Sequence, residues 1–127
     1  MAAGDFPTYV TESTTVLWAG GAAARLAGTF VNFANGFAFA GSGFLGVLSQ
    51  DLVANAPAGT PVGVDIEGIV QVYSGAAIAV GAAMTCQINS GEFITAVAGQ
   101  DVHGRAMTAA TAVGQRMLMK ITREGKA

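Results

Sequence analysis

Short stretches in which large apolar residues alternate with small or polar ones recur along the second half of the chain. Two of them, residues 59–68 (GTPVGVDIEG) and 114–121 (GQRMLMKI), begin at a glycine and place a large apolar side chain at every second position. Those side chains are Val62, Val64, Ile66, Met117, Met119 and Ile121. An alternation with a period of two puts such residues on one face of a β-strand. Each stretch therefore predicts a strand with one buried face.

The rest of the sequence has the same character. Glycine separates short alternating segments at intervals of about ten residues, which is typical of a small all-β barrel or sandwich. Residues 92–97 (EFITAV) predict another strand. Only residues 106–113 (AMTAATAV) have helical propensity, and this segment is too short to form a helix alone. The predicted fold is mainly β.

The dipeptide Asn35-Gly36 predicts a β-hairpin, because both residues tolerate the positive φ of a type I′ turn. A two-residue loop places Phe33 on one face of this hairpin and Phe37 and Phe39 on the other. A hairpin with phenylalanine on both faces exposes apolar surface unless each face is covered. We expect one face to meet the domain core and the other to meet another subunit or a partner.

The apolar content is high, at 52%, and the charged content is only 11%. Two uncharged stretches, residues 26–50 and 68–91, exceed the length that spans a bilayer. Both contain asparagine or glutamine and several glycines, and unpaired amides are costly in lipid. The first residues contain Asp5 and Glu12 and no basic cluster, unlike a secretory signal. We therefore expect no membrane association.

The formal net charge is −2, but the basic residues gather near the end of the chain. Residues 104–127 contain five of the six Lys and Arg residues. No aromatic residue lies among them, so the pattern does not favour nucleic-acid binding. We expect these cations to cover the solvated face of a final strand.

The stretch GSGFLG, residues 41–46, has the spacing G-x-G-x-x-G found in dinucleotide-binding turns. Phosphate binding by that motif requires a strand before it and a helix after it. Here Pro57 follows soon afterwards and a predicted strand comes next. The stretch is therefore expected to bind no nucleotide.

Cys86, His103 and Asp101 are the residue types of an activated thiol nucleophile. Cys86 lies in an alternating segment that predicts a half-buried thiol, and His103 lies in a predicted loop, where it is expected to be solvated. Asp65 and Glu67 share one predicted strand face and are expected to form its polar side. The lone histidine and lone cysteine provide too few ligands for zinc. The sequence predicts no enzyme activity, metal site or cofactor.

The region from GVLSQDLVANAPAGTPVGVDIEGIVQVYSGAAIAVGAAM through GRAMTAATAVGQRMLMKI, about residues 45–122, resembles the capsid cement, or head-decoration, proteins of tailed bacteriophages. The similarity is the sequence of glycine, alanine and β-branched positions around GAAIAVG and GRAM. It implies a small β-barrel or β-tulip-like domain that binds the outer surface of the expanded capsid. Such a protein is a structural component of the virion, made in the host cytoplasm.

The resemblance further implies that the chain forms a homotrimer and bridges neighbouring major capsid proteins. We divide the chain into an extended N-terminal arm (residues 1–15), a hairpin-containing elaboration (16–44) and a β-barrel core (45–127); residues 16–44 have no counterpart in the family pattern. In such proteins the arm contacts the capsid. By position, the contacting residues here are Phe6, Pro7, Thr8, Tyr9 and Val10, and the expected interface residues of the hairpin are Phe33, Phe37 and Phe39.

A second hypothesis is a β-barrel binding module of a phage fibre or surface appendage, with a receptor or a glycan as its ligand. This hypothesis requires exposed aromatic side chains. Trp18 and Tyr73 are its candidates in the sequence.

Overall fold

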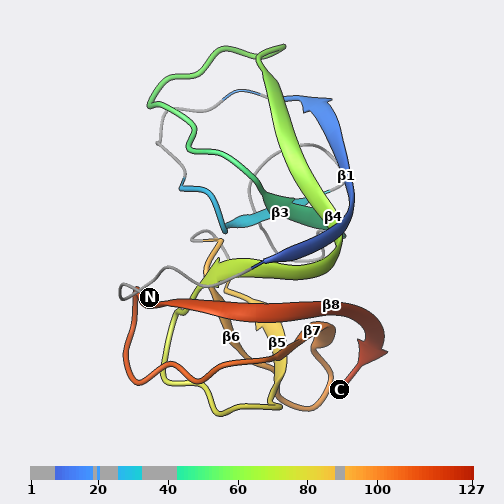
Figure 1. Cartoon of the computed structure of the whole chain (residues 1–127), viewed down its shortest axis with the longest axis vertical. Helices are drawn as coiled ribbons and strands as arrows, with labels where there is room; N and C mark the ends of the chain where they lie inside the picture. Colours follow the sequence, from blue (N-terminus) through green and yellow to red (C-terminus); the bar gives the residue numbers. More distant parts are fainter. Residues whose placement is uncertain (1–7, 19, 21–25, 33–42, 88–90) are drawn as a thin grey trace.

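A computed structural model of the chain is all-β in the residues that it describes, namely 8–18, 20, 26–32, 43–87 and 91–127 (Figure 1). No helix in these residues is long and apolar enough to cross a membrane. The described strands are β1 (Tyr9–Leu17), β2 (Phe30–Asn32), β3 (Phe44–Leu48), β4 (Pro61–Tyr73), β5 (Ala83–Cys86), β6 (Phe93–Thr95), β7 (Asp101–Ala106) and β8 (Arg116–Lys126).

The strands form one sheet in the order β2-β3-β4-β8-β7-β5-β6, and β1 also pairs with β4. Every pairing between named strands is antiparallel. The two ends of the order approach each other, because the Phe30 N–H of β2 donates to the carbonyl of Gly91, just before β6, at 2.9 Å. Strand β6 also meets the segment that follows β4, where the Gly75 N–H donates to the Phe93 carbonyl at 2.7 Å. The sheet is thus nearly closed and barrel-shaped, which confirms the predicted small β-barrel.

Strand β4 is long, and its two halves lie in different parts of the molecule, one with β1 and β3 and the other with β8 (Figure 1). Its first half lies between β1 and β3, since Asp65 pairs with Ser13 of β1 and with Val47 of β3. Its second half pairs with β8. Ile69 pairs with both β1 and β8, so β8 and β3 lie along the same edge of β4, one after the other.

The change of neighbours along β4 occurs around Gly68. This residue has φ of +112°, and a Cβ there would collide with the backbone of Tyr9 and Thr11. Only glycine combines this conformation with so close an approach of two strands. Gly68 therefore allows β1 to approach β4 closely at the point where β4 bends.

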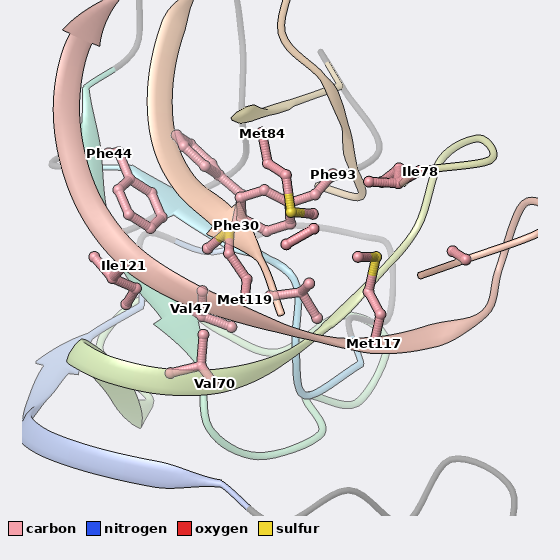
Figure 2. Close-up of a cluster of buried hydrophobic side chains, with 13 residues drawn as sticks. Phe30, Phe44, Val47, Val70, Ile78, Met84, Phe93, Met117, Met119 and Ile121 are labelled. Carbon is pink, nitrogen blue, oxygen red and sulfur yellow. The ribbon is translucent and has the colours of Figure 1, made fainter. Parts of the chain in front are cut away.

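The buried side chains form two clusters on either side of the bend. Figure 2 shows the larger one, which side chains from β2, β3, β4 and β8 form together with residues of β5, β6 and β7 and of two segments between strands. It contains Phe30, Phe44, Val47, Val70, Val72, Ile78, Met84, Phe93, Ala106, Ala110, Met117, Met119 and Ile121. The smaller cluster contains Trp18, Val31, Leu48, Leu52, Ala56, Val62 and Val64.

The alternating patterns predicted these buried faces well. Five of the six apolar positions of the two repeated stretches are buried, and the sixth, Ile66, is half-buried beside the bend. The strand predicted over residues 92–97 is present as β6. Residues 106–113 contain no helix, and Ala110 instead forms an isolated bridge with Ile78.

Part of the segment between residues 16 and 44 belongs to the barrel sheet. Strand β2 is buried along its whole length and pairs with β3, with Phe30 opposite Val47. The predicted turn at Asn35-Gly36 lies outside the described residues.

Candidate partner-binding surface

Strand β1 is attached to the domain differently from every other described strand. It pairs with β4 over its whole length, from Tyr9 opposite Ile69 to Leu17 opposite Pro61. Every residue of β1 is exposed except Val16, which is half-buried. The strand is therefore held in place by its backbone and contributes almost nothing to the hydrophobic core.

The arm residues predicted to contact a partner fall partly on this strand. Thr8, Tyr9 and Val10 are exposed, and the Tyr9 side chain retains 69% of its accessible surface. Leu17, at the other end of β1, is 62% exposed. The remaining predicted contact residues lie outside the described residues: Phe6, Pro7, Phe33, Phe37 and Phe39.

A groove of about 470 Å³ lies between β1, β4 and β8 beside Gly68. Its lining residues are Tyr9, Thr11, Glu67, Gly68, Ile69, Lys120, Ile121, Thr122 and Arg123. The β8 wall carries the cations Lys120 and Arg123. Glu67 lies on β4 opposite Glu12 of β1, so the other side of the groove is acidic. Neither the sequence patterns nor the resemblance indicated this groove.

Arg123 spans the gap between β3 and β8, which pair one after the other with the same edge of β4. Its Nη1 donates to the Phe44 carbonyl at 2.7 Å, and its Nη2 donates to the carbonyls of Leu45 (2.7 Å) and Ile66 (2.8 Å). Its guanidinium also lies 4.8 Å from the centre of the Phe44 ring. Partial burial lowers the pKa of Arg123, and the nearby Glu67 and Glu12 oppose this effect.

His103 is buried, so the predicted loop position and solvent exposure are wrong. It lies on β7, is 7% exposed, and stacks on the Phe44 ring with 4.6 Å between ring centres. The centre of the Phe30 ring lies 5.5 Å from the centre of the His103 ring. Desolvation lowers the pKa of His103 to about 4; the Asp101 carboxylate opposes this shift and Arg123 adds to it. The imidazole is therefore neutral at neutral pH.

The Cys86 thiol is half-buried, as its alternating segment predicted. Burial raises its pKa to about 11, and the negative charge of Asp101 adds to this shift. The thiolate is the reactive form of cysteine, so the native thiol is poorly nucleophilic at neutral pH. Asp101 itself forms an ion pair with Lys126 at 3.1 Å. The surroundings of Cys86, Asp101 included, raise the pKa of the thiol, whereas an activated nucleophile requires a lowered one.

Asp65 and Glu67 lie on the outer face of β4, as predicted, with Val62 and Val64 buried on the inner face. Partial burial raises the pKa of Asp65. Among the described residues, no group of three or more His, Cys, Asp or Glu side chains is arranged to hold a metal ion.

The other candidate residues from the sequence lie within strands or in the core. Residues 44–48 form β3, so no helix follows the glycines of the GSGFLG stretch. Trp18 is 2% exposed and belongs to the smaller core cluster. Tyr73 is half-buried, and its hydroxyl accepts a hydrogen bond from Arg116 Nε at 2.8 Å. Neither aromatic ring is presented to solvent in the manner that the glycan-binding hypothesis requires.

The basic residues near the end of the chain are more engaged than the sequence predicted. Arg105 binds Glu124 through two nitrogens, at 2.7 and 2.8 Å, and the two hydrogen bonds hold the pKa of Glu124 down to about 2. Lys126 pairs with Asp101, and Arg116 with the Tyr73 hydroxyl. In the part of the chain that the structure describes, the exposed side chain of Lys120 forms no hydrogen bond or ion pair.

Comparison of the chain with protein-family models gives no match, and comparison with curated proteins gives none either. The functional argument therefore depends on the surface of the domain itself.

Proposed function

We propose that the chain is a structural virion protein that binds the outer surface of the expanded phage capsid and bridges neighbouring major capsid proteins. Strand β1 is the observation that carries this proposal. It is fixed along β4 while its side chains remain exposed, and it includes three exposed large apolar residues: Tyr9, Val10 and Leu17. Exposed apolar residues gathered on one element mark a surface that another protein covers.

The rest of the domain is built as a rigid unit, as a protein that holds neighbouring capsid proteins together requires. Antiparallel pairing joins the strands into a nearly closed sheet, and Arg123 ties β8 to β3 and β4 at the bend. A rigid domain loses little conformational entropy when it docks. Association into a homotrimer, which the resemblance implies, presents several copies of β1 to the shell at once. Multivalent binding of this kind converts a weak single contact into tight attachment.

The experiment measures how much purified protein pellets with expanded and with unexpanded shells assembled from the major capsid protein encoded in the same genome. We expect saturable binding to expanded shells and protection of those shells against rupture by heat or a chelator. Absence of binding to expanded shells would refute the proposal.

Paired substitutions locate the contact. The double variant Tyr9→Ser/Leu17→Ser removes two large apolar side chains from β1 and is expected to weaken shell binding at least about tenfold. The control, Val80→Ser/Val97→Ser, removes two side chains of similar exposure, 65% and 62%, from loops outside β1. Equal binding by the two double variants would exclude β1 as the docking element.

A further inference from the structure

The groove between β1, β4 and β8 adjoins the surface that the proposed function assigns to the capsid. Tyr9, which is 69% exposed on β1, lines the groove and is also one of the apolar residues proposed to contact the shell. A capsid protein that covers Tyr9 therefore lies over the groove. The groove has a volume of about 470 Å³. Protein sites that hold small ligands occupy roughly 300–1,000 Å³, so the groove has room for a side chain of that partner.

Lys120, on the β8 wall of the groove, is a cation with no carboxylate beside it. Its side chain is exposed and forms no hydrogen bond or ion pair. Its partners in register on the two adjacent strands are Ile69 of β4, which is apolar, and Arg105 of β7, which is positively charged. Leu118 and Thr122, two residues away along β8, are uncharged. None of these four neighbouring positions supplies a carboxylate to Lys120.

The carboxylates on the strands around the groove act on other cations. Glu124, on the same strand as Lys120, binds Arg105 through two hydrogen bonds. Glu67 lines the β4 side of the groove, and its charge favours the protonated guanidinium of Arg123. The charge of Lys120 is thus not compensated by a direct contact within the described residues.

We propose that the major capsid protein inserts an acidic side chain, aspartate or glutamate, into this groove, where its carboxylate pairs with Lys120. The inference rests on the proposed function, because the partner is the protein that covers Tyr9. The apolar part of the inserted side chain lies against Ile69, which is half-buried at the groove. Opposite charges that face each other across an interface fix the register in which two proteins dock.

The acidic side of the groove restricts the ligand to a single carboxylate. Glu67 lines that side, and Glu12 lies opposite Glu67 on β1. Like charges brought together at an interface oppose binding. A polyanion such as a nucleic acid that reached Lys120 would also meet these two carboxylates, whereas a single acidic side chain can contact Lys120 and remain on the β8 side.

Charge variants of Lys120 test the contact in the shell-pelleting experiment. Lys120→Glu places two carboxylates against each other and is expected to lower the association constant at least about tenfold. Lys120→Gln removes one charge, so its binding is expected to be weaker and to depend less on salt concentration than that of the wild type. The control is Lys126→Gln, which removes the same charge from the same strand outside the groove. We expect this control to bind shells as the wild type does.

Carbodiimide coupling on bound shells identifies the partner residue. The reagent joins an amine to a carboxylate in direct contact as an amide, and the carbodiimide takes up the water that is lost and becomes a urea. We expect a cross-linked peptide pair that contains Lys120 and an aspartate or glutamate of the capsid protein. Lys120→Arg keeps the positive charge without the amine, so it is expected to bind shells and to lose this cross-link.

The outcomes separate this inference from the proposed function. If the wild type does not bind expanded shells, the proposed function fails and the groove contact fails with it. If the wild type binds and Lys120→Glu binds equally well, only the groove contact is overturned. The contact is also overturned if Lys126→Gln weakens binding as much as Lys120→Gln does, because net charge then explains the effect. Coupling that joins Lys120 to no capsid carboxylate on bound shells likewise overturns it.

Discussion

Arg123 is joined to Phe44 twice: its guanidinium lies 4.8 Å from the centre of the Phe44 ring, and its Nη1 donates to the Phe44 carbonyl at 2.7 Å. This pair of contacts lies where β3 and β8 separate along the edge of β4. Arg123 also donates hydrogen bonds to the backbone carbonyls of Leu45 and Ile66 at this gap, where neither β3 nor β8 supplies a backbone donor. One side chain thereby connects the two parts of the molecule.

Arg123→Ala is expected to lower the free energy of unfolding by about 2–3 kcal/mol, because it removes hydrogen bonds from a charged donor and a cation–π contact. Urea denaturation followed by fluorescence measures the change. Lys120→Ala, on the same strand and without hydrogen bonds, is the control and is expected to change stability by less than about 0.5 kcal/mol. Similar losses in the two variants would show that Arg123 does not join the strands.

Burial of His103 makes stability depend on pH. Its pKa is about 4 in the folded protein against 6.5 for an unperturbed histidine, so the unfolded state binds the proton more tightly. The stabilisation is complete above pH 6.5 and is lost as the pH falls toward 4, amounting to about 3 kcal/mol. Denaturation midpoints measured at intervals across this range reveal the loss.

His103→Phe is the matched variant for this pH dependence, since it keeps a ring against Phe44 and cannot be protonated. Its stability is expected to stay nearly constant from pH 6.5 to about pH 4.5, below which the carboxylates begin to contribute. A wild-type profile that coincides with that of His103→Phe would contradict the burial of a neutral imidazole.

Gly68→Ala is expected to loosen β1 from β4. The added Cβ would collide with the backbone of Tyr9 and Thr11, and φ of +112° is strained for alanine, so we expect a loss of roughly 2–4 kcal/mol. Hydrogen exchange should accelerate along β1 more than along β8. Gly114→Ala is the control: its φ is also positive, at +79°, but no atom lies within 4 Å of the added Cβ, so a loss of about 1 kcal/mol is expected. Equal exchange along β1 in both variants would contradict the role of Gly68.

Native Cys86 is expected to react slowly with a thiol reagent at pH 7.5, and its rate should continue to rise with pH up to about 11. The rate in urea provides the reference for an exposed thiol. Labelling of the native protein as fast as the unfolded protein would mean that the thiol is accessible and ionised.

The buried faces were predictable because strand alternation is a local property of the sequence. Val62 and Val64 lie two positions apart, as do Met117 and Met119, and all four are buried. Leu118, between the two methionines, is buried as well, which alternation alone does not predict. Phe30 could be recognised as an apolar residue but not assigned to the core, since its neighbours Phe44 and Phe93 come from distant segments.

The surface features depended on contacts that local sequence does not contain. Nothing distinguishes Arg123 from Arg116 in the sequence, although Gly125, two residues later, hints at an irregular strand end. His103 looked like a loop residue because aspartate and glycine flank its segment, yet the rings of Phe30 and Phe44 bury it. The groove arises only where three strands meet.

The most direct test of the proposed function is the amount of protein bound per expanded shell, measured in pellets over a range of protein concentrations for the full chain and for a variant lacking residues 1–15. We predict saturable binding by the full chain. The variant should keep a folded barrel, because these residues contribute no buried side chain among those described, and should bind much more weakly. Binding of the full chain no greater than its sedimentation without shells would contradict the capsid-binding function, and unchanged binding by the variant would contradict the role of the arm and β1.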